Sequence, residues 1–224
     1  MIITIDGPSA SGKSTISKIV ADQLGFYYIN TGLMYRAIAY IGYTYFGLNT
    51  SQLAHLSKDV VDKITDNNNL VYHYNQKDGA TMLYEGNNIT PFLKDAFVDT
   101  LVSIISPQAI VRTAMVTMQQ HIAYQHDSIA EGRDLGTVVF PHAHYKFFVT
   151  ASLEERARRW QKDQHARGHT YTLEQAKTYL QERDTKDSNR TLSPLKKPAH
   201  AKEIDTTHKT IAQSAQEIIS TVKQ

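Results

Sequence analysis

The sequence predicts an α/β fold in which helices cover both faces of a parallel β-sheet. The first thirty residues read as strand, loop, helix and strand, which is the pattern of a βαβ unit. Two later apolar segments, residues 128–132 and 145–151, are suited to strands buried inside a parallel sheet. Segments with helical periodicity separate these strands. We therefore expect one domain over residues 1–224, a length that allows a large buried core.

The N-terminal elements are marked by apolar runs and by glycines. Residues 2–5 are a β-branched run that predicts a strand, and residues 13–24 carry apolar side chains at helical spacing before a glycine. Residues 26–30 predict a second strand, and residues 32–47 predict a helix that also ends at a glycine. A further amphipathic helix is expected over residues 51–65.

The character of the sequence changes after this helix. Residues 66–92 are rich in Asn, Gly and Tyr, unlike the segments around them. Within this stretch, residues 70–75 and 81–86 read as short antiparallel strands around a turn at residues 77–79. A β-meander inside an α/β protein indicates an insertion, so we expect a small subdomain here.

The C-terminal part returns to helices and strands in alternation. Helical periodicity resumes at residue 95 and is interrupted near Pro107. The elements expected beyond the two apolar strands are helices over residues 153–167 and about 172–184, a weaker strand over residues 202–206, and a final helix over residues 209–222.

Composition excludes several classes of protein. Lys+Arg 24 against Asp+Glu 22 is nearly balanced, whereas a protein that binds nucleic acid through many phosphate contacts needs a larger basic surplus. The absence of cysteine excludes disulfides and thiolate metal sites. The N-terminus lacks the features of a signal peptide, and no apolar run approaches the roughly 20 residues of a membrane span. We expect a cytoplasmic monomer with neither a nucleic acid nor a membrane as partner.

Residues 7–14, GPSASGKS, match the phosphate-loop motif G-x-x-x-x-G-K-[ST] at each fixed position, directly after a strand and at the start of a helix. Gly7 and Gly12 permit backbone angles that let successive N–H groups surround phosphate oxygens. Lys13 is expected to reach the outer phosphates, and the Ser14 hydroxyl to bind Mg²⁺. The motif predicts a P-loop NTPase core whose triphosphate contacts come from Gly7, Pro8, Ser9, Ala10, Ser11, Gly12, Lys13, Ser14 and Thr15.

A phosphate loop does not by itself distinguish a switch, a motor and a kinase. The positions of two arginines favour phosphoryl transfer. Arg36 follows the second strand and Arg133 follows the strand at residues 128–132, and segments that leave the carboxyl ends of parallel strands converge on one crevice. Guanidinium groups bind phosphate bidentately and neutralise the charge of a transferring phosphoryl group.

Residues 182–190, ERDTKDSNR, contain three acids and three bases. Two interpretations are possible. The stretch could be a solvated helix end with weak ion pairs between neighbouring turns. Alternatively it is a lid whose cations close over phosphates, while its acids hold the arginines in place when the site is open. The phosphate loop and the other arginines favour the lid.

Five segments, IDGPSASGKS, NTGLMYR, EGRDLGTVVFP, SLEERARR and ERDTKDSNR…PL, occur in the order and spacing of bacterial cytidylate kinases. The chain resembles this family over essentially its full length. The resemblance implies transfer of the γ-phosphoryl group of ATP to CMP or dCMP with Mg²⁺, an NMP-binding insertion over about residues 36–95, and a helical lid over about residues 154–192. Another P-loop small-molecule kinase, such as a UMP kinase, remains an alternative, and so does a nucleotide-dependent switch or binding module.

The resemblance also implies roles for residues that bind the acceptor nucleotide. Thr31, Tyr35 and Arg36 fall on the motif that receives this nucleotide, with Arg36 on its phosphate. Ser103 and Arg112 align with positions that read the edge of cytosine. Pyrimidine choice follows from such contacts, because a site built for the cytosine amino group leaves polar groups unpaired when uracil binds.

A second set of implied roles lies near the predicted lid. Arg133 aligns with a phosphate-binding arginine and Asp134 with an acid that reads the base. Arg183 and Asp187 match positions near the acceptor's sugar and phosphate, and Arg190 matches a phosphate contact made on closure. The residues expected to act in catalysis are Lys13, Arg133, Arg183 and Arg190.

Four positions depart from the family pattern. Asn30 stands where an acid usually precedes the Thr/Ser-Gly pair, and Glu131 stands where Asp is common. Lys186 and Ser188 occupy lid positions that are arginine in some relatives. These departures bear on the contacts around the site and leave fewer guanidinium groups in the lid.

Overall fold

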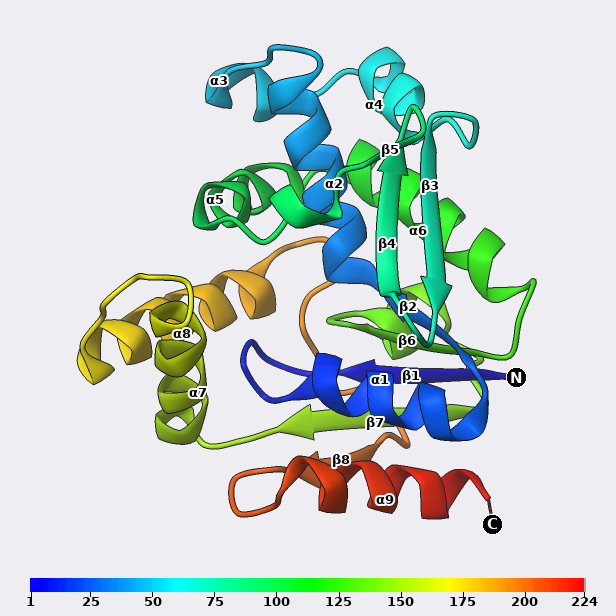
Figure 1. Ribbon diagram of the computed structural model, residues 1–224, viewed down its shortest axis with the longest axis vertical. Helices are drawn as coiled ribbons and strands as arrows, with labels where there is room; N and C mark the ends of the chain where they lie inside the picture. Colours follow the sequence, from blue (N-terminus) through cyan, green and yellow to red (C-terminus); the bar gives the residue numbers. More distant parts are fainter. Residues whose placement is uncertain (224) are drawn as a thin grey trace. The chain divides into compact units, whose positions relative to one another are not determined.

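The computed structural model describes residues 1–223 and divides into two compact units. The first unit combines Met1–Phe26 with the chain from Ser128 onward, and the second unit is Tyr27–Asp127. Figure 1 shows the helices and strands of each unit.

The first unit is built on a parallel β-sheet. Its strands lie in the order β6-β1-β7-β8, and each neighbouring pair is parallel. Every residue of β6 is buried, and so are the last four of β1, which explains why these strands read as continuous runs without polar alternation. The predicted α/β class with a parallel sheet is therefore confirmed. The strands are β1 (Ile2–Asp6), β6 (Ser128–Gly132), β7 (Tyr145–Thr150) and β8 (Lys202–Asp205).

Helices of the first unit pack on this sheet and on each other. The helix after the phosphate loop contacts both β6 and the C-terminal helix, while the two helices that follow β7 contact each other. A short π-helical segment, which the sequence did not predict, follows β6. These elements are α1 (Lys13–Leu24), the π-helical segment η2 (Leu135–Val139), α7 (Leu153–His165), α8 (Leu173–Asn189) and α9 (Ile211–Val222).

Helix α8 is longer than the sequence predicted. The expected helix over about residues 172–184 continues to Asn189, so the charged stretch up to Asn189 belongs to this helix. No proline or glycine occurs between residues 173 and 189, and the helix ends where the backbone of Arg190 becomes extended. α7 and α8 lie against each other (Figure 1) around a small core of Ala157, Ala176 and Leu180.

The second unit contains short helices and an antiparallel sheet in the order β3-β4-β5. The expected antiparallel strands are present, although the second one starts two residues earlier than predicted, at Gly79. The single helix predicted over residues 51–65 is wrong: two helices are separated at residues 54–57 because Ser57 caps the second, its side chain accepting from the Val60 N–H. The strands are β2 (Tyr27–Asn30), β3 (Leu70–Asn75), β4 (Gly79–Tyr84) and β5 (Asn87–Asn88).

The helices of the second unit include the predicted pair around Pro107. The segment over residues 95–126 is two helices that meet at a bend of 106°. Within the described part of the chain, no single helix has both the length and the apolar character to cross a membrane, although this bent pair meets the test by length and composition. The helices are α2 (Thr31–Thr44), α3 (Thr50–Leu53), α4 (Lys58–Thr65), the 3₁₀ segment η1 (Thr90–Phe92), α5 (Ala96–Ile105) and α6 (Ala109–Ala123).

Tyrosine hydroxyls join β2 to the antiparallel sheet. The Tyr72 hydroxyl accepts from the Asn30 N–H at 2.9 Å and donates to the Tyr28 carbonyl at 2.8 Å. The Tyr27 hydroxyl accepts from the Tyr74 N–H at 2.9 Å. These contacts fix the strand from which α2 starts, and α2 carries three of the predicted acceptor-binding residues.

Candidate active site

The phosphate loop connects β1 to α1 as predicted. Gly7 and Gly12 have φ values of 149° and 91°, which favour glycine. A Cβ at Gly7 would lie 2.0 Å from the Val149 carbonyl oxygen, so a side chain cannot be placed there without moving β7. No side chain caps the N-terminus of α1, and uncapped N–H groups at the start of a helix favour the binding of an anion.

Lys13 lies inside this loop and is 5% exposed. Its Nζ donates to the Pro8 carbonyl at 2.6 Å and to Ser11 Oγ at 3.4 Å. Burial lowers the pKa of Lys13 well below its usual value, and the positive charge of Arg133 lowers it further. A phosphate in the loop would supply the negative charge that favours the ammonium form.

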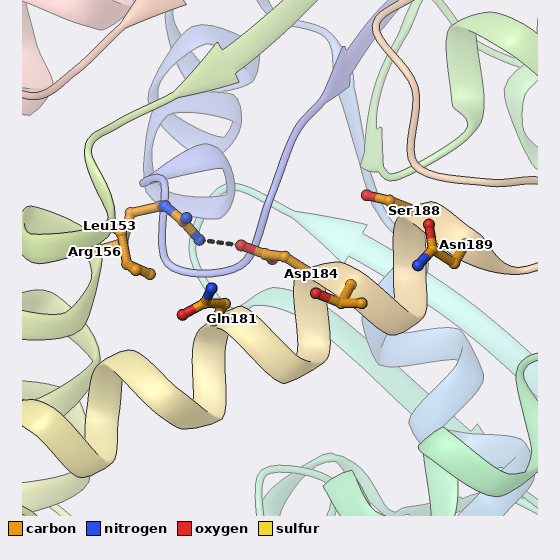
Figure 2. Close-up of a pocket in the computed structure, with 7 residues that line it drawn as sticks. Leu153, Arg156, Gln181, Asp184, Ser188 and Asn189 are labelled. Atoms are coloured by element: carbon orange, nitrogen blue, oxygen red, sulfur yellow. Dashed lines mark hydrogen bonds and ion pairs between the residues drawn. The ribbon is translucent and has the colours of Figure 1, made fainter.

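A cavity of about 360 Å³ opens between α7 and α8 beside the loop (Figure 2). Its lining includes Arg156, a residue that is 8% exposed, and Asp184. Arg156 donates to Asp184 at 2.5 Å and to the Ser9 carbonyl at 3.2 Å. The Ser9 N–H donates to Asp184 at 3.3 Å, so both residues contact the phosphate loop, although no individual role was predicted for either.

Arg133 links the phosphate loop to α8. Its Nη2 donates to Ser9 Oγ at 2.9 Å and its Nε donates to Asp187 Oδ2 at 3.0 Å. Its Nη1 donates to the Gly132 carbonyl at 3.2 Å, and the side chain is 21% exposed. The structure thus places Arg133 beside Lys13 in one unit, as the sequence predicted from the carboxyl ends of the strands.

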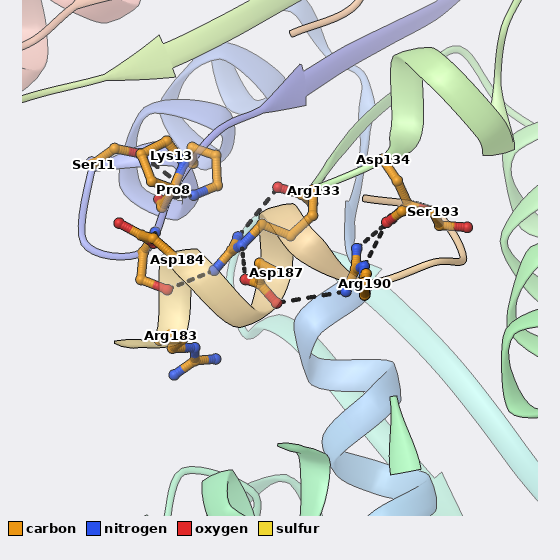
Figure 3. A network of polar contacts seen from close by, with 12 residues as sticks. Pro8, Ser11, Lys13, Arg133, Asp134, Arg183, Asp184, Asp187, Arg190 and Ser193 are labelled. Carbon is orange, nitrogen blue, oxygen red and sulfur yellow. Dashed lines mark hydrogen bonds and ion pairs between the residues drawn. The ribbon is translucent and has the colours of Figure 1, made fainter. Parts of the chain in front are cut away.

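Asp187 joins Arg133 to Arg190, one of the predicted lid arginines (Figure 3). Its carboxylate pairs with Arg133 at 3.0 Å and with Arg190 at 3.5 Å. Burial alone would raise the pKa of Asp187, but the charges of Arg133, Arg190 and Arg183 outweigh burial and hold this pKa below its usual value. Asp187 therefore holds Arg133 and Arg190 in place, and the closure of this segment as a lid stays a prediction.

Arg190 also reaches the segment that follows β6. Its Nη2 lies 3.7 Å from Asp134 Oδ1, and its Nε donates to the Ser193 carbonyl at 2.5 Å. Asp134 is 6% exposed. Arg183 contacts its own helix, where Nη1 donates to the Tyr179 hydroxyl at 3.3 Å. Of the predicted lid residues, Asp187 and Arg190 thus join the network around Arg133 directly.

Two predicted acceptor-binding residues of the second unit, Arg36 and Ser103, both contact Asp99. Arg36, on α2, pairs with Asp99 on α5, whose Oδ1 lies 3.0 Å from Nε and 2.7 Å from Nη2. Ser103 lies one turn further along α5, and its hydroxyl donates to the Asp99 carbonyl at 3.2 Å. A Cβ at Gly32 would lie 3.1 Å from Arg36 Nη1, so glycine leaves room for this side chain.

The predicted base-reading arginine lies close to the same helix. Arg112 is 5% exposed, donates to the Ser106 carbonyl at 3.1 Å, and lies over the ring of Tyr35 at 5.7 Å. Thr31, 5% exposed, is the first residue of α2. Asn30 caps this helix by accepting from the Leu33 N–H at 3.0 Å, which gives the unusual asparagine a structural role.

Sequence reasoning missed Asp6, the last residue of β1. Its two carboxylate oxygens accept from the backbone N–H groups of Leu135 at 2.9 Å and Gly136 at 2.8 Å. These bonds fix the start of η2 and therefore the turn that carries Arg133 and Asp134. Burial raises the pKa of Asp6 from 3.8 to about 6, against the opposing effect of the two backbone hydrogen bonds.

Asp6→Asn should change how stability depends on pH. A raised pKa means that Asp6 stabilises the folded state below about pH 4 and that this contribution is lost as pH rises through about 6. Asparagine does not titrate, so the variant does not lose stability in this way as pH rises. The free energy of unfolding of the variant minus that of wild type should therefore increase by up to roughly 3 kcal/mol between pH 4 and pH 7. Urea unfolding at several pH values measures this difference. A difference that stays constant with pH would contradict it.

Asp205→Asn provides the control for this experiment. Hydrogen bonds from the Thr207 side chain and backbone lower the pKa of Asp205, so its contribution is present above its ordinary pKa and is lost as pH falls. The relative stability of this variant should therefore change with pH in the opposite direction.

Comparisons with known proteins agree over the length of the chain. The family model for cytidylate kinase matches residues 3–224. A cytidylate kinase from Listeria monocytogenes is 38% identical over 218 residues, which cover 97% of this chain and 94% of that protein. An uncharacterized protein from Eubacterium ventriosum has a solved structure that matches with a TM-score of 0.53 at 9% identity, covering 100% of this chain and 99% of that chain, which bears on the fold alone. The chain belongs to the cytidylate kinase family.

Proposed function

We propose that the protein transfers the γ-phosphoryl group of ATP to CMP or dCMP and releases ADP with CDP or dCDP. Membership of the family supports this reaction. The observation that carries the assignment of residues is the network in which Asp187 joins Arg133 and Arg190 beside the phosphate loop. Such an arrangement supplies positive charge where a phosphoryl group would transfer.

The phosphate loop would hold the donor. Its backbone N–H groups and the N-terminus of α1 would bind the β- and γ-phosphates of ATP. Lys13 would exchange the Pro8 carbonyl for a phosphate oxygen, which is a stronger acceptor because it is charged. Thr15, on the first turn of α1, completes the proposed set of donor contacts.

Mg²⁺ would bind at the same loop. Within residues 1–223, no group of three or more His, Cys, Asp or Glu side chains could hold a metal ion. Asp6 is occupied by two backbone N–H groups. The exposed Ser14 hydroxyl is a suitable oxygen ligand, and the phosphates and water would complete the coordination. When bound, Mg²⁺ neutralises charge on the transferring phosphates.

The second unit would bind the acceptor. Arg36 would bind the CMP phosphate, and Thr31 and Tyr35 would line the same site. Ser103 and Arg112 would read the cytosine edge, and Arg112 is already held over the Tyr35 ring. Asp134, a residue of the first unit, would accept from the cytosine amino group, because a carboxylate is an acceptor when ionised.

Phosphoryl transfer would then proceed without a covalent enzyme intermediate. Lys13, Arg133, Arg183 and Arg190 would neutralise the charge on the transferring group, and α8 would help to exclude water, which otherwise competes as acceptor. Asp187 would keep Arg133 and Arg190 in position between turnovers. We also propose that the protein acts as a cytoplasmic monomer, because every assigned residue lies on one chain and its lack of cysteine suits a reducing compartment.

A panel of acceptors tests this function. Purified protein with ATP and Mg²⁺ should form ADP with CMP or dCMP at least roughly 10²-fold faster than with UMP, AMP or GMP, judged by kcat/KM, because uracil and the purines leave polar groups of the site unpaired. A coupled assay for ADP measures all five. Equal rates with all five acceptors would contradict the cytosine assignment. Slow ATP hydrolysis whose rate does not change when any acceptor is added would indicate a nucleotide-dependent switch.

A further inference from the structure

The backbone of Ser9 is held on both sides by side chains that have no role in the function proposed above. Its N–H donates to Asp184 Oδ1 at 3.3 Å, and its carbonyl accepts from Arg156 Nη1 at 3.2 Å. The same Nη1 donates to Asp184 Oδ2 at 2.5 Å. The three residues therefore form a closed ring of hydrogen bonds around the third residue of the phosphate loop, and Figure 2 shows the Arg156 and Asp184 side chains pointing toward each other.

This ion pair is largely withdrawn from solvent. The Arg156 side chain is 9% exposed and that of Asp184 is 18% exposed. Arg156 is further fixed by a hydrogen bond from Nε to the Ala151 carbonyl, at 3.1 Å, just after β7. An ion pair with this burial responds strongly to loss of one partner, because the remaining charge is left unpaired.

The ring is also connected to the arginine proposed for catalysis. Ser9 Oγ accepts from Arg133 Nη2 at 2.9 Å, and Arg133 is held by Asp187. Asp184 and Asp187 are three residues apart on α8, so they lie on the same face of the helix. One acid of α8 thus holds the loop directly, and the other holds it through Arg133.

We propose that Asp184 is a positioning residue for phosphoryl transfer, which, together with Arg156, sets the backbone of the phosphate loop against α8. This inference rests on the proposed kinase function. Asp184 acts through the Ser9 backbone and through the Arg156 guanidinium group, and touches no reacting atom. Its loss should therefore affect the donor side of the reaction, while Arg36 and Arg112, proposed acceptor-binding residues of the second unit, keep their own contacts.

The experiment compares Asp184→Asn with wild type and with Glu182→Gln, a matched change at an exposed acid of the same helix. Asp184→Asn should lower kcat roughly 10- to 100-fold, because the phosphate loop no longer holds the donor in the reactive position. KM for CMP should stay within about threefold of wild type. Calorimetry with MgADP should show affinity reduced roughly 10-fold, since the loop is no longer held in place. Glu182→Gln should match wild type in each measurement.

Two further variants distinguish positioning from a general loss of stability. Asp184→Glu keeps the carboxylate and should recover much of the lost kcat. The double variant Asp184→Asn with Arg156→Gln should be little worse than either single variant, because the two side chains act as one unit. Should Asp184→Asn fail to fold, Arg156→Lys, which keeps the charge but loses the planar fork, should still lower kcat about 10-fold.

Several results would overturn the proposal. Wild-type kcat in Asp184→Asn, or in Arg156→Lys, would show that the ring has no part in positioning. Tighter MgADP binding by Asp184→Asn would show that the carboxylate competes with phosphate instead of ordering the loop. Failure of the kinase function is a separate outcome, seen as absence of CMP-dependent turnover in wild type and Glu182→Gln. Even without CMP-dependent turnover, the affinity for MgADP tests whether Asp184 positions the phosphate loop.

Discussion

Arg133→Ala should lower kcat for phosphate transfer to CMP by roughly 10³-fold, in the range found for arginines that neutralise a transferring phosphoryl group. In the structure this guanidinium group contacts the phosphate loop through Ser9 and α8 through Asp187. Its removal takes away positive charge next to Lys13 and separates the loop from the acid that faces it. Single-turnover and steady-state rates at saturating ATP and CMP measure the loss.

The control for this change is Arg158→Ala. Arg158 is an arginine on α7 that is 60% exposed and pairs with Glu154 one helical turn away. Exposed pairs of this kind contribute little, so kcat should remain within about twofold of wild type. If kcat of Arg133→Ala falls less than tenfold, Arg133 does not neutralise the transferring phosphoryl group. Other cations would then have to neutralise that charge.

Several elements were predictable because their determinants are local. The helix over residues 13–24 has the predicted bounds, since glycines stand at both ends and the apolar residues recur at helical spacing. The phosphate loop could be located for the same reason: its two glycines are needed by the backbone of the loop itself. The first antiparallel strand, over residues 70–75, was also predicted with the bounds that it has.

The elements that were predicted wrongly depend on weaker signals. One helix was expected over residues 51–65, but the caps at Asn49 and Ser57 each start a helix of their own. The end of α8 was placed too early, because no proline or glycine marks where this helix ends, and the charged run that follows residue 184 is compatible with a helix. Capping and charged residues mark the end of a helix only when the hydrogen bonds of their side chains are known.

The residues missed at the site all act through contacts distant in sequence. Asp184 and Ser9 are 175 residues apart, and Asp6 and Gly136 are 130 residues apart. Neither acid belongs to a short motif with its partner, so no spacing in the sequence points to the pair. The carboxyl ends of parallel strands predict that such residues converge, but not which carboxylate will accept which N–H group.

Arg36→Ala should lower kcat/KM for CMP by roughly 10²- to 10³-fold, because a charged hydrogen-bonding partner of the acceptor phosphate is lost. The structure holds this guanidinium group on α2 through Asp99, at 2.7 Å and 3.0 Å, before any nucleotide binds. Affinity for MgADP should stay within about twofold of wild type, because the phosphate loop belongs to the other unit. Initial rates over a range of CMP concentrations, together with calorimetry, separate the two effects. A switch without an acceptor would lose neither property.

Asp99→Asn separates the charge of Arg36 from its orientation. One oxygen of Asp99 receives two N–H groups of the arginine, so an amide at this position would leave the guanidinium group charged but held less firmly. KM for CMP should then rise less than about tenfold, while kcat should change little. The reason is that the bound CMP phosphate itself helps to orient the Arg36 guanidinium group. A loss equal to that in Arg36→Ala would mean that the pair acts as one unit, and orientation rather than charge alone would then determine capture of the acceptor.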